Sequence, residues 1–158
     1  MNMRGFSLIE LLIVIALIGI LVSAATFGFT QYSRKSKMES QTRLLYGDLM
    51  EYRAKALYEK KNWTFKFSAA SYGIYSSAAT TVSPVSTVIF KYSVDNTANL
   101  NTTPITFDTQ GMTDVSGTVC VAGANDANVD SVVISRTRVQ IGKRKEGLTC
   151  LGENIDAR

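Results

Sequence analysis

Histidine is absent from this chain of 158 residues, and cysteine, proline and tryptophan are scarce, with two, two and one residues. Without histidine the chain has neither a Ser-His-Asp triad nor an imidazole ligand for a metal ion. The two cysteines, Cys120 and Cys150, stand 30 positions apart and lack the paired spacing of a zinc site. Gly111, Gly117 and Gly123 are spaced as turns rather than as a phosphate-binding loop. We therefore predict that the protein is not an enzyme and has no cofactor.

Charged side chains are missing from a long stretch near the start of the chain. Leu11 to Ser33 gives 23 uncharged, mostly apolar residues, and a helix of about 20 residues is enough to cross a bilayer. Glu10 stands just before this run, and a carboxylate near the membrane is costly unless a cation neutralises it. No basic residue lies between Glu10 and Arg34, so the partner comes from the N-terminus or from another molecule. A chance glutamate at the level of the lipid headgroups is the alternative.

The first ten residues carry a specific pattern. Residues 1–5, MNMRG, are followed by residues 6–10, FSLIE, and then by the apolar run. This arrangement resembles the class III signal of type IV prepilins and type II secretion pseudopilins. The resemblance implies that prepilin peptidase cuts between Gly5 and Phe6, that Phe6 is then N-methylated, and that Glu10 acts in filament assembly.

Elementary electrostatics supports that role for Glu10. Cleavage after Gly5 exposes an α-amine on Phe6, and this amine remains a cation when it is methylated. In a packed helical bundle, Glu10 of one subunit can pair with the Phe6 amine of its neighbour. Either group buried alone would cost several kcal/mol, so the pair favours one axial register. The implied partners are other pilin or pseudopilin subunits, prepilin peptidase and the inner-membrane assembly platform.

Two other interpretations of the apolar run remain open. A secretory signal peptide would be cleaved near Val22-Ser23-Ala24, although a glutamate in its apolar region argues against it. A plain single-pass anchor is the second. Arg34, Lys35 and Lys37 follow the run, and the positive-inside rule would place the C-terminal domain in the cytoplasm. The resemblance implies the opposite, and we follow it: a bacterial inner-membrane protein with its C-terminal domain outside the cytoplasm, later part of a filament.

The helix is expected to continue beyond the membrane. No proline occurs between residues 6 and 60. Apolar side chains recur at helical spacing in the second half of this stretch, at Met38, Leu45, Leu49, Tyr52 and Ala56. We predict one helix of about 80 Å, at a rise of about 1.5 Å per residue. Residues 6–33 form its membrane or filament-core part, and residues 34–61 form its amphipathic continuation.

Residues 62–158 read as one globular, β-rich domain. Short strands are predicted at residues 63–67, 72–75, 87–94, 105–107, 117–122 and 129–141, separated by polar or glycine-containing turns. An antiparallel sheet offers one apolar face to the helical stripe, so the expected fold class is α+β, with the helix packed on one antiparallel sheet. The pilin-like fold implied by the resemblance has the same arrangement.

The two cysteines bear on the compartment. Two buried free thiols would suit a cytosolic chain, whereas outside the inner membrane a disulfide between Cys120 and Cys150 is expected. Such a bridge closes a loop of about 30 residues and is worth roughly 3–4 kcal/mol in the chain-entropy model.

Five cations lie within ten residues near the C-terminus: Arg136, Arg138, Lys143, Arg144 and Lys145. A solvated, charged face is one interpretation of this run. Binding of DNA phosphates, with a steep loss of affinity in salt, is the other. No aromatic residue interleaves with these cations, so no platform for base stacking is predicted.

Residues 132–141, VVISRTRVQI, resemble the terminal strands of the GspH/FimT group of minor pseudopilins and minor pilins. We therefore predict a minor pilin or pseudopilin that acts at the filament tip or in priming assembly. A DNA-binding minor pilin for natural transformation and a major pilus subunit are the alternatives.

Overall fold

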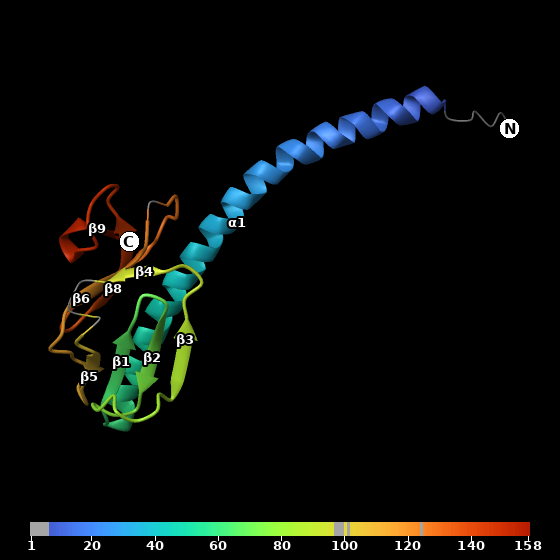
Figure 1. Ribbon diagram of the computed structural model, residues 1–158. Helices are drawn as coiled ribbons and strands as arrows, with labels where there is room; N and C mark the ends of the chain where they lie inside the picture. Colours follow the sequence, from blue (N-terminus) through green and yellow to red (C-terminus); the bar gives the residue numbers. More distant parts are fainter. Residues whose placement is uncertain (1–6, 97–99, 101, 124) are drawn as a thin grey trace. The chain divides into compact units, whose positions relative to one another are not determined.

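The computed structural model describes residues 7–96, 100, 102–123 and 125–158, with all of their side chains except those of residues 24–27. One long helix is followed by a series of short strands (Figure 1). The chain divides into two compact units, residues 1–34 and residues 35–158, and each is described by itself below.

The helix α1 runs from Leu8 to Glu59, a length of 52 residues. It ends two residues before residue 61, the limit expected from the sequence. Lys60 has a φ of 53°, in the left-handed region, and so does not continue the helix. Helix α1 therefore contributes both to the first unit and to the second.

In the second unit, one stripe of α1 is buried. Met38, Leu45, Leu49 and Ala56 are almost completely inaccessible to solvent. Tyr52 lies beside them and places its ring 4.7 Å from that of Trp63. The amphipathic stripe predicted from the sequence is confirmed.

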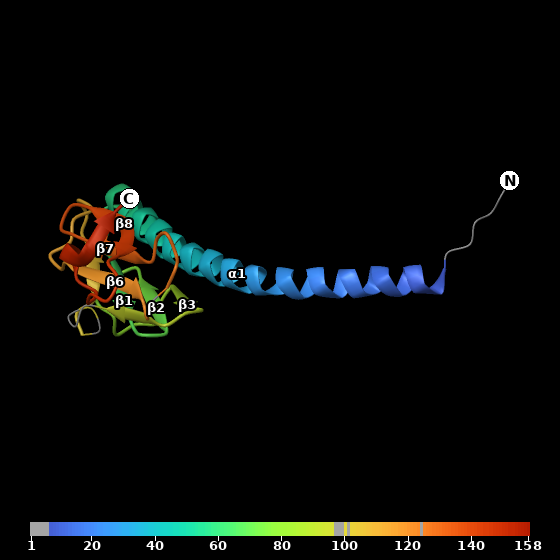
Figure 2. The ribbon, with the colours of Figure 1, turned by 90° about the horizontal axis from the view of Figure 1, so that it is seen from above.

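The strands form two antiparallel sheets. The first has the order β3-β2-β1-β5 and consists of β1 (Trp63–Phe67), β2 (Ser71–Tyr75), β3 (Ser86–Ile89) and β5 (Ile105–Phe107). The second has the order β4-β6-β7-β8-β9 and consists of β4 (Val94–Asn96), β6 (Gly117–Val121), β7 (Ser131–Ile134), β8 (Val139–Arg144) and β9 (Ile155–Ala157). A short 3-10 helix, Gly152–Asn154, precedes β9. Within the second unit, both views place the strands beside α1 (Figures 1 and 2).

The main hydrophobic core joins α1 to both sheets. Leu49 from α1, Phe65 from β1 and Val132 from β7 belong to one buried cluster. Burial of each such side chain contributes about 1.5–3 kcal/mol relative to exposure. The α+β class and its pilin-like arrangement are confirmed, whereas the prediction of a single sheet is wrong.

The predicted strand at residues 87–94 is divided between the two sheets. Phe90 leaves β3 and is buried. Two residues later, the Tyr92 N–H donates to Gln41 Oε1 and the Gln41 amide donates to the Tyr92 carbonyl, both at 2.8 Å. A side chain of α1 thus takes the hydrogen bonds that a neighbouring strand would otherwise make. The chain can then start β4 in the other sheet.

The predicted strand at residues 129–141 is a hairpin. A tight turn at residues 135–138 separates β7 from β8, and the Ser135 N–H donates to the Arg138 carbonyl at 2.8 Å. Ile134 pairs with Val139 across this turn. Strand β9 was not predicted from the sequence; it is only three residues long and pairs with β8 near the C-terminus.

Candidate functional site

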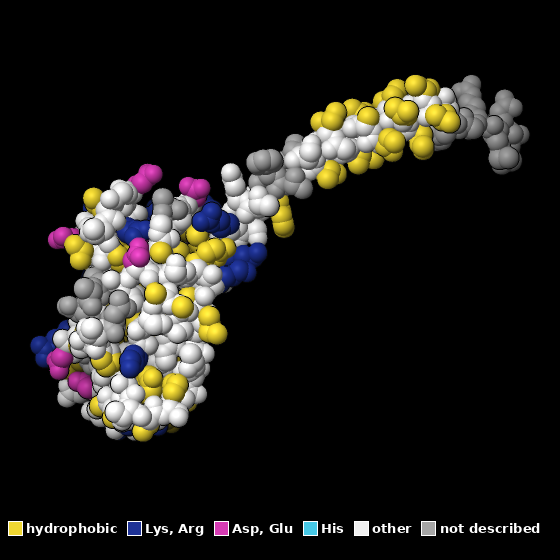
Figure 3. Space-filling view, viewed as in Figure 1, with side chains coloured by type: hydrophobic (Ala, Val, Ile, Leu, Met, Phe, Trp, Pro, Cys, Tyr) yellow, Lys and Arg dark blue, Asp and Glu magenta, His cyan; other side chains and the backbone are white. Residues whose placement is uncertain are grey.

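In the first unit, α1 presents apolar side chains to the surroundings on every side. The described side chains of residues 7–23 are all exposed, and among the large apolar ones the exposed fraction ranges from 81% at Leu8 to 45% at Val14. The space-filling view shows these apolar side chains covering the face of the helix in sight (Figure 3). The most apolar window has a mean hydropathy of 2.8, so this helix is long and apolar enough to cross a membrane.

Glu10 is the acidic residue in the first turn of α1. Its N–H donates to the Ser7 carbonyl at 3.1 Å, which starts the helix. A carboxylate in a first turn interacts favourably with the helix dipole, by about 0.3–1 kcal/mol. The spacing from Ser7 to Glu10 also matches a capping box, a pattern that the sequence analysis did not use. Within the described part of the chain, Glu10 takes part in no ion pair.

Gly5 and Phe6, the predicted processing residues, lie outside the described residues. Cleavage and N-methylation at these positions therefore stay predictions from the sequence.

The five C-terminal cations do not form one cluster. Arg136 and Arg138 belong to the turn between β7 and β8, whereas Lys143 and Arg144 end β8 and Lys145 follows it. At about 3.3 Å per residue along a strand, Arg138 and Arg144 are separated by about 20 Å. The structure thus divides the run into two groups, one at each end of β8.

At the turn, both arginines are exposed. Arg136 is 3.6 Å from Asp114, and the two side chains are 74% and 93% exposed. An ion pair as exposed as this contributes about 0–1 kcal/mol. Arg138 forms no ion pair among the residues that the structure describes. These two side chains are available to an external anion.

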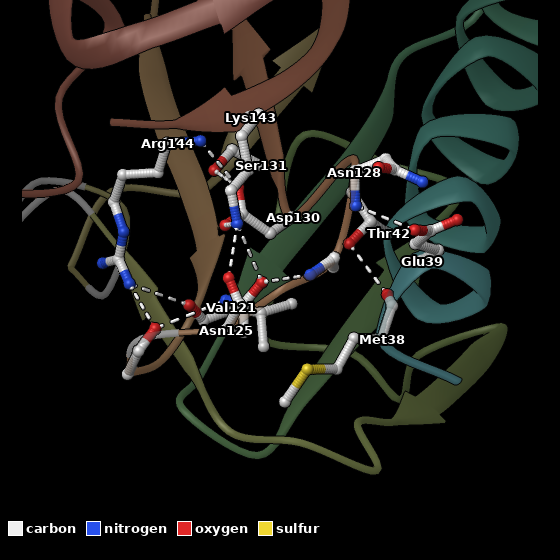
Figure 4. A network of polar contacts seen from close by, with 12 residues as sticks. Met38, Glu39, Thr42, Val121, Asn125, Asn128, Asp130, Ser131, Lys143 and Arg144 are labelled. Carbon is white, nitrogen blue, oxygen red and sulfur yellow. Dashed lines mark hydrogen bonds and ion pairs between the residues drawn. The ribbon is translucent and has the colours of Figure 1, made fainter. Parts of the chain in front are cut away.

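At the other end of β8, cations are used inside the fold (Figure 4). Asp130 is 2% exposed, and its Oδ1 accepts hydrogen bonds from Ser131 Oγ at 2.7 Å and from the Arg144 N–H at 2.8 Å. Its Oδ2 is 3.2 Å from Lys143 Nζ, which also donates to the Asn125 carbonyl at 2.6 Å. The buried carboxylate is therefore fully engaged by groups of its own chain.

The Arg144 guanidinium is engaged in a similar way. It lies 3.3 Å from Asp95 Oδ2 and donates to the Gly123 carbonyl at 2.7 Å. Lys145, more exposed, is 3.6 Å from Asp156. The adjoining open groove of about 680 Å³ is lined by side chains of both signs. This end of β8 consequently holds the fold together rather than presenting free positive charge.

The chain between β6 and β7, which includes Asn125 and Asn128, is also attached to α1. Glu39 accepts the Asn128 N–H at 2.8 Å, and Lys35 Nζ lies 3.3 Å from Asn128 Oδ1. Asp130, the centre of this network, was not predicted from the sequence. The available clue was an acid set among the apolar residues Val129, Val132 and Val133, where it must be buried and therefore needs partners.

Cys120 and Cys150 form a disulfide in the structure, with a Cα–Cα distance of 5.9 Å. Both residues are buried. The bridge ties the segment after β8 to β6, so the C-terminal part of the chain is held against the second sheet.

Comparison with known proteins bears on the first residues only. Residues 1–26 match the family model of the prokaryotic N-terminal methylation motif. No curated protein and no solved structure gives a significant match to the chain. The structure described above has a long helix packed on antiparallel sheets, in a pilin-like arrangement. The matched motif supports assignment of the chain to the type IV pilin and pseudopilin family.

Proposed function

We propose that this protein is a non-catalytic structural subunit, a minor pilin or pseudopilin. Prepilin peptidase cleaves it between Gly5 and Phe6 and Phe6 is N-methylated. The apolar part of α1 anchors it in the inner membrane with the globular unit outside the cytoplasm. The assembly platform then transfers it into a type IV pilus or a type II secretion pseudopilus, at the tip or during priming.

One observation carries this proposal. The exposed apolar surface of residues 8–23 contains a single charge, Glu10, and the described residues offer no cation to it. The methylation motif at residues 1–26 supports processing at the N-terminus, and in this proposal the Phe6 amine of a neighbouring subunit is the missing partner. Hydrophobic packing between helices provides adhesion, and the ion pair provides alignment, because an unpaired buried charge costs several kcal/mol.

Intact mass and N-terminal sequencing of protein taken from filaments test the processing step. We expect a chain that begins at Phe6 and carries one additional methyl group on its amine. A chain that begins at Met1, or beyond Ala24, would contradict the proposal.

The choice between a minor and a major subunit rests on the resemblance of residues 132–141 to the GspH/FimT group. Copy number in sheared filaments tests it. A few copies per filament are expected of a tip or priming subunit, whereas a chain that dominates the filament would be the major pilin.

DNA capture is the second candidate function, and the exposure of Arg136 and Arg138 favours it. Two cations neutralise fewer phosphates than five, so the salt dependence of binding would be shallow, with a log–log slope of about −0.9 per phosphate contact. Replacement of both arginines by alanine tests the idea in a DNA-binding titration at low salt. Unchanged binding, or no binding by the unsubstituted protein, would exclude it.

A further inference from the structure

Strand β3 is the last strand at one end of the first sheet (Figure 1). The N–H of Phe90, just after β3, donates to the Ala70 carbonyl at 2.8 Å. Pairs of residues that exchange hydrogen bonds alternate with pairs that do not along an antiparallel ladder, so Val88 also turns its backbone groups toward β2. The N–H and C=O groups of Thr87 and Ile89 then point away from β2, and in the described part of the chain no strand pairs with that side. Strand β3 therefore offers backbone donors and acceptors to a further strand.

This edge lacks the features that usually protect an open strand. Charged side chains and proline within an edge strand discourage pairing with other chains. Strand β3 has the sequence STVI, and no charged residue occurs between Lys66 and Lys91. The edges of the second sheet differ, because β4 carries Asp95 and β9 carries Asp156, and both aspartates form ion pairs. An open edge with the composition of β3 is suited to strand addition.

Apolar surface lies on both sides of this edge. Val88 is opposite Tyr72, whose hydroxyl reaches α1, so the side chain of Val88 is on the face that packs on α1. A groove of about 220 Å³ lies on this side, and Leu44 of α1, which is 53% exposed, lines it. The side chain of Ile89, 79% exposed, is on the opposite face because side chains alternate along a strand. An added strand would cover Leu44 with one side chain and Ile89 with the next, removing apolar surface from water.

The charge beside this edge has one sign. Lys37 from α1 and Lys91 from the chain after β3 line the groove, and its lining includes no acidic residue. Both lysines are exposed, and neither takes part in an ion pair among the residues that the structure describes. An acidic side chain at this end of an added strand would therefore be attracted. Strand β3 of a second copy does not supply one, because residues 67–90 are uncharged.

We propose that β3 is a docking site for an extended segment of another protein, which adds to the first sheet as an antiparallel strand. The side chains of this segment alternate between Leu44 and Ile89, and its N-terminal end carries an acidic residue beside Lys37 and Lys91. Antiparallel pairing is the more stable arrangement per residue, and it places the N-terminal end of the segment next to the C-terminal end of β3. This docking needs only the second unit, so it is independent of leader cleavage and of Glu10.

The probe is a synthetic peptide, acetyl-EEVLTV-amide, added to the full chain in nanodiscs of phosphatidylcholine, a lipid without net charge. Its third residue is designed to lie opposite Ile89 and its fourth opposite Val88. At a peptide concentration about ten times the dissociation constant, we expect amide hydrogen exchange at Thr87 and Ile89 to slow about tenfold. The Val88 amide, already bonded to β2, is the internal reference. Nuclear magnetic resonance reads each amide separately, and exchange that does not slow at Thr87 and Ile89 would overturn the docking site.

Two methylated peptides separate strand pairing from simple occupation of the groove. N-methylation of the third residue removes an N–H that faces β3, and this peptide should no longer protect the Ile89 amide. N-methylation of the fourth residue alters an N–H that faces away from β3, and this peptide should protect as the parent peptide does. Equal effects of the two methyl groups would show that the peptide does not add as a strand.

Charge variants test the chemistry of the partner. Lys91→Gln should weaken binding of the acidic peptide about two- to fivefold, the effect of an exposed ion pair. Lys66→Gln, at an exposed position on β1 outside the groove, should leave binding unchanged. A peptide that copies residues 85–90 of this chain, VSTVIF, should bind more weakly than the acidic probe. Equal effects of the two substitutions would overturn the acidic partner, and tighter binding of the copied peptide would overturn it in favour of a second copy of this chain.

Discussion

Tyr72 on β2 donates its phenolic hydrogen to Asp48 Oδ2 on α1, with 2.5 Å between the two oxygens. Tyr72 is almost fully buried, so this bond joins the helix to the first sheet inside the core. Burial, followed by the hydrogen bond to Asp48 and the charge of that carboxylate, raises the pKa of the Tyr72 phenol far above its ordinary value of 10.0. A neutral Tyr72 is therefore part of the folded state.

This contact predicts a specific alkaline behaviour. Because the pKa of Tyr72 is raised on folding, its contribution to stability is complete below pH 10 and is lost as pH rises above 10, where the unfolded chain ionises first. Tyr72→Phe should lower the free energy of unfolding by about 1–3 kcal/mol at pH 7, and this deficit should shrink above pH 10. Urea unfolding of the full chain in detergent, followed by Trp63 fluorescence, measures both. Tyr58→Phe, at a position 89% exposed, is the control, and a deficit constant with pH would contradict the assignment.

The burial of Asp130 predicts that replacing its carboxylate costs more stability than replacing an exposed carboxylate. Asp130→Asn places an amide in a site built for Lys143 Nζ and the Arg144 N–H, so we expect a loss of about 1.5–3 kcal/mol. Asp114→Asn disrupts the exposed pair with Arg136 and should change stability by less than about 1 kcal/mol. Thermal unfolding of the two full-length variants provides the comparison. Equal losses of stability in the two variants would show that burial of the Asp130 network does not stabilise the fold.

Alanine substitutions at Gly142 on β8 and at Gly47 on α1 should change stability in opposite directions. A Cβ at Gly142 would lie 2.6 Å from the Asp156 carbonyl oxygen of β9, a backbone atom. Gly142→Ala should therefore push β9 away and cost about 1–3 kcal/mol. Gly47→Ala, on α1 with open space around it, should instead stabilise by about 0.5–1 kcal/mol. Hydrogen exchange of the β9 amides should accelerate only in the first variant, and unchanged exchange there would argue against the close approach of β9.

The disulfide predicts that single and double cysteine variants lose the same amount of stability. Cys120→Ser, Cys150→Ser and the double variant should each lose about 3–4 kcal/mol, because each removes the same loop constraint. The intact mass of the exported, non-reduced protein should be lower than that of the dithiol by two hydrogen atoms. Free thiols in exported protein, or additive losses in the double variant, would contradict the bridge.

The helix could be predicted from the sequence because its determinants are local. The uncharged run, the absence of proline and the stripe through Leu45 and Leu49 specify α1 without reference to other parts of the chain. The change of sheet after Phe90 could not be predicted in the same way. It depends on hydrogen bonds from Gln41, 51 positions away from Tyr92.

The same contrast between local determinants and long-range contacts applies to the candidate site. The anomaly at Glu10 is visible in one sequence because a charge beside an apolar run needs a partner. The cation run was misleading because sequence proximity does not show that Lys143 faces Asp130 while Arg138 faces solvent. Partners of a side chain across a sheet depend on register, which the spacing of residues within one strand does not contain.

In the proposed function, Glu10 aligns subunits by pairing with the amine of a neighbouring subunit. Glu10→Gln keeps the size of the side chain and removes the charge, and a helix of 52 residues tolerates the loss of a first-turn interaction worth about 0.3–1 kcal/mol. The direct measurement is the amount of this variant in sheared filaments relative to the membrane pool, with Ser7→Ala as the control. We expect normal membrane insertion and leader removal, with incorporation into filaments strongly impaired. Incorporation at the level of the unsubstituted protein would contradict it.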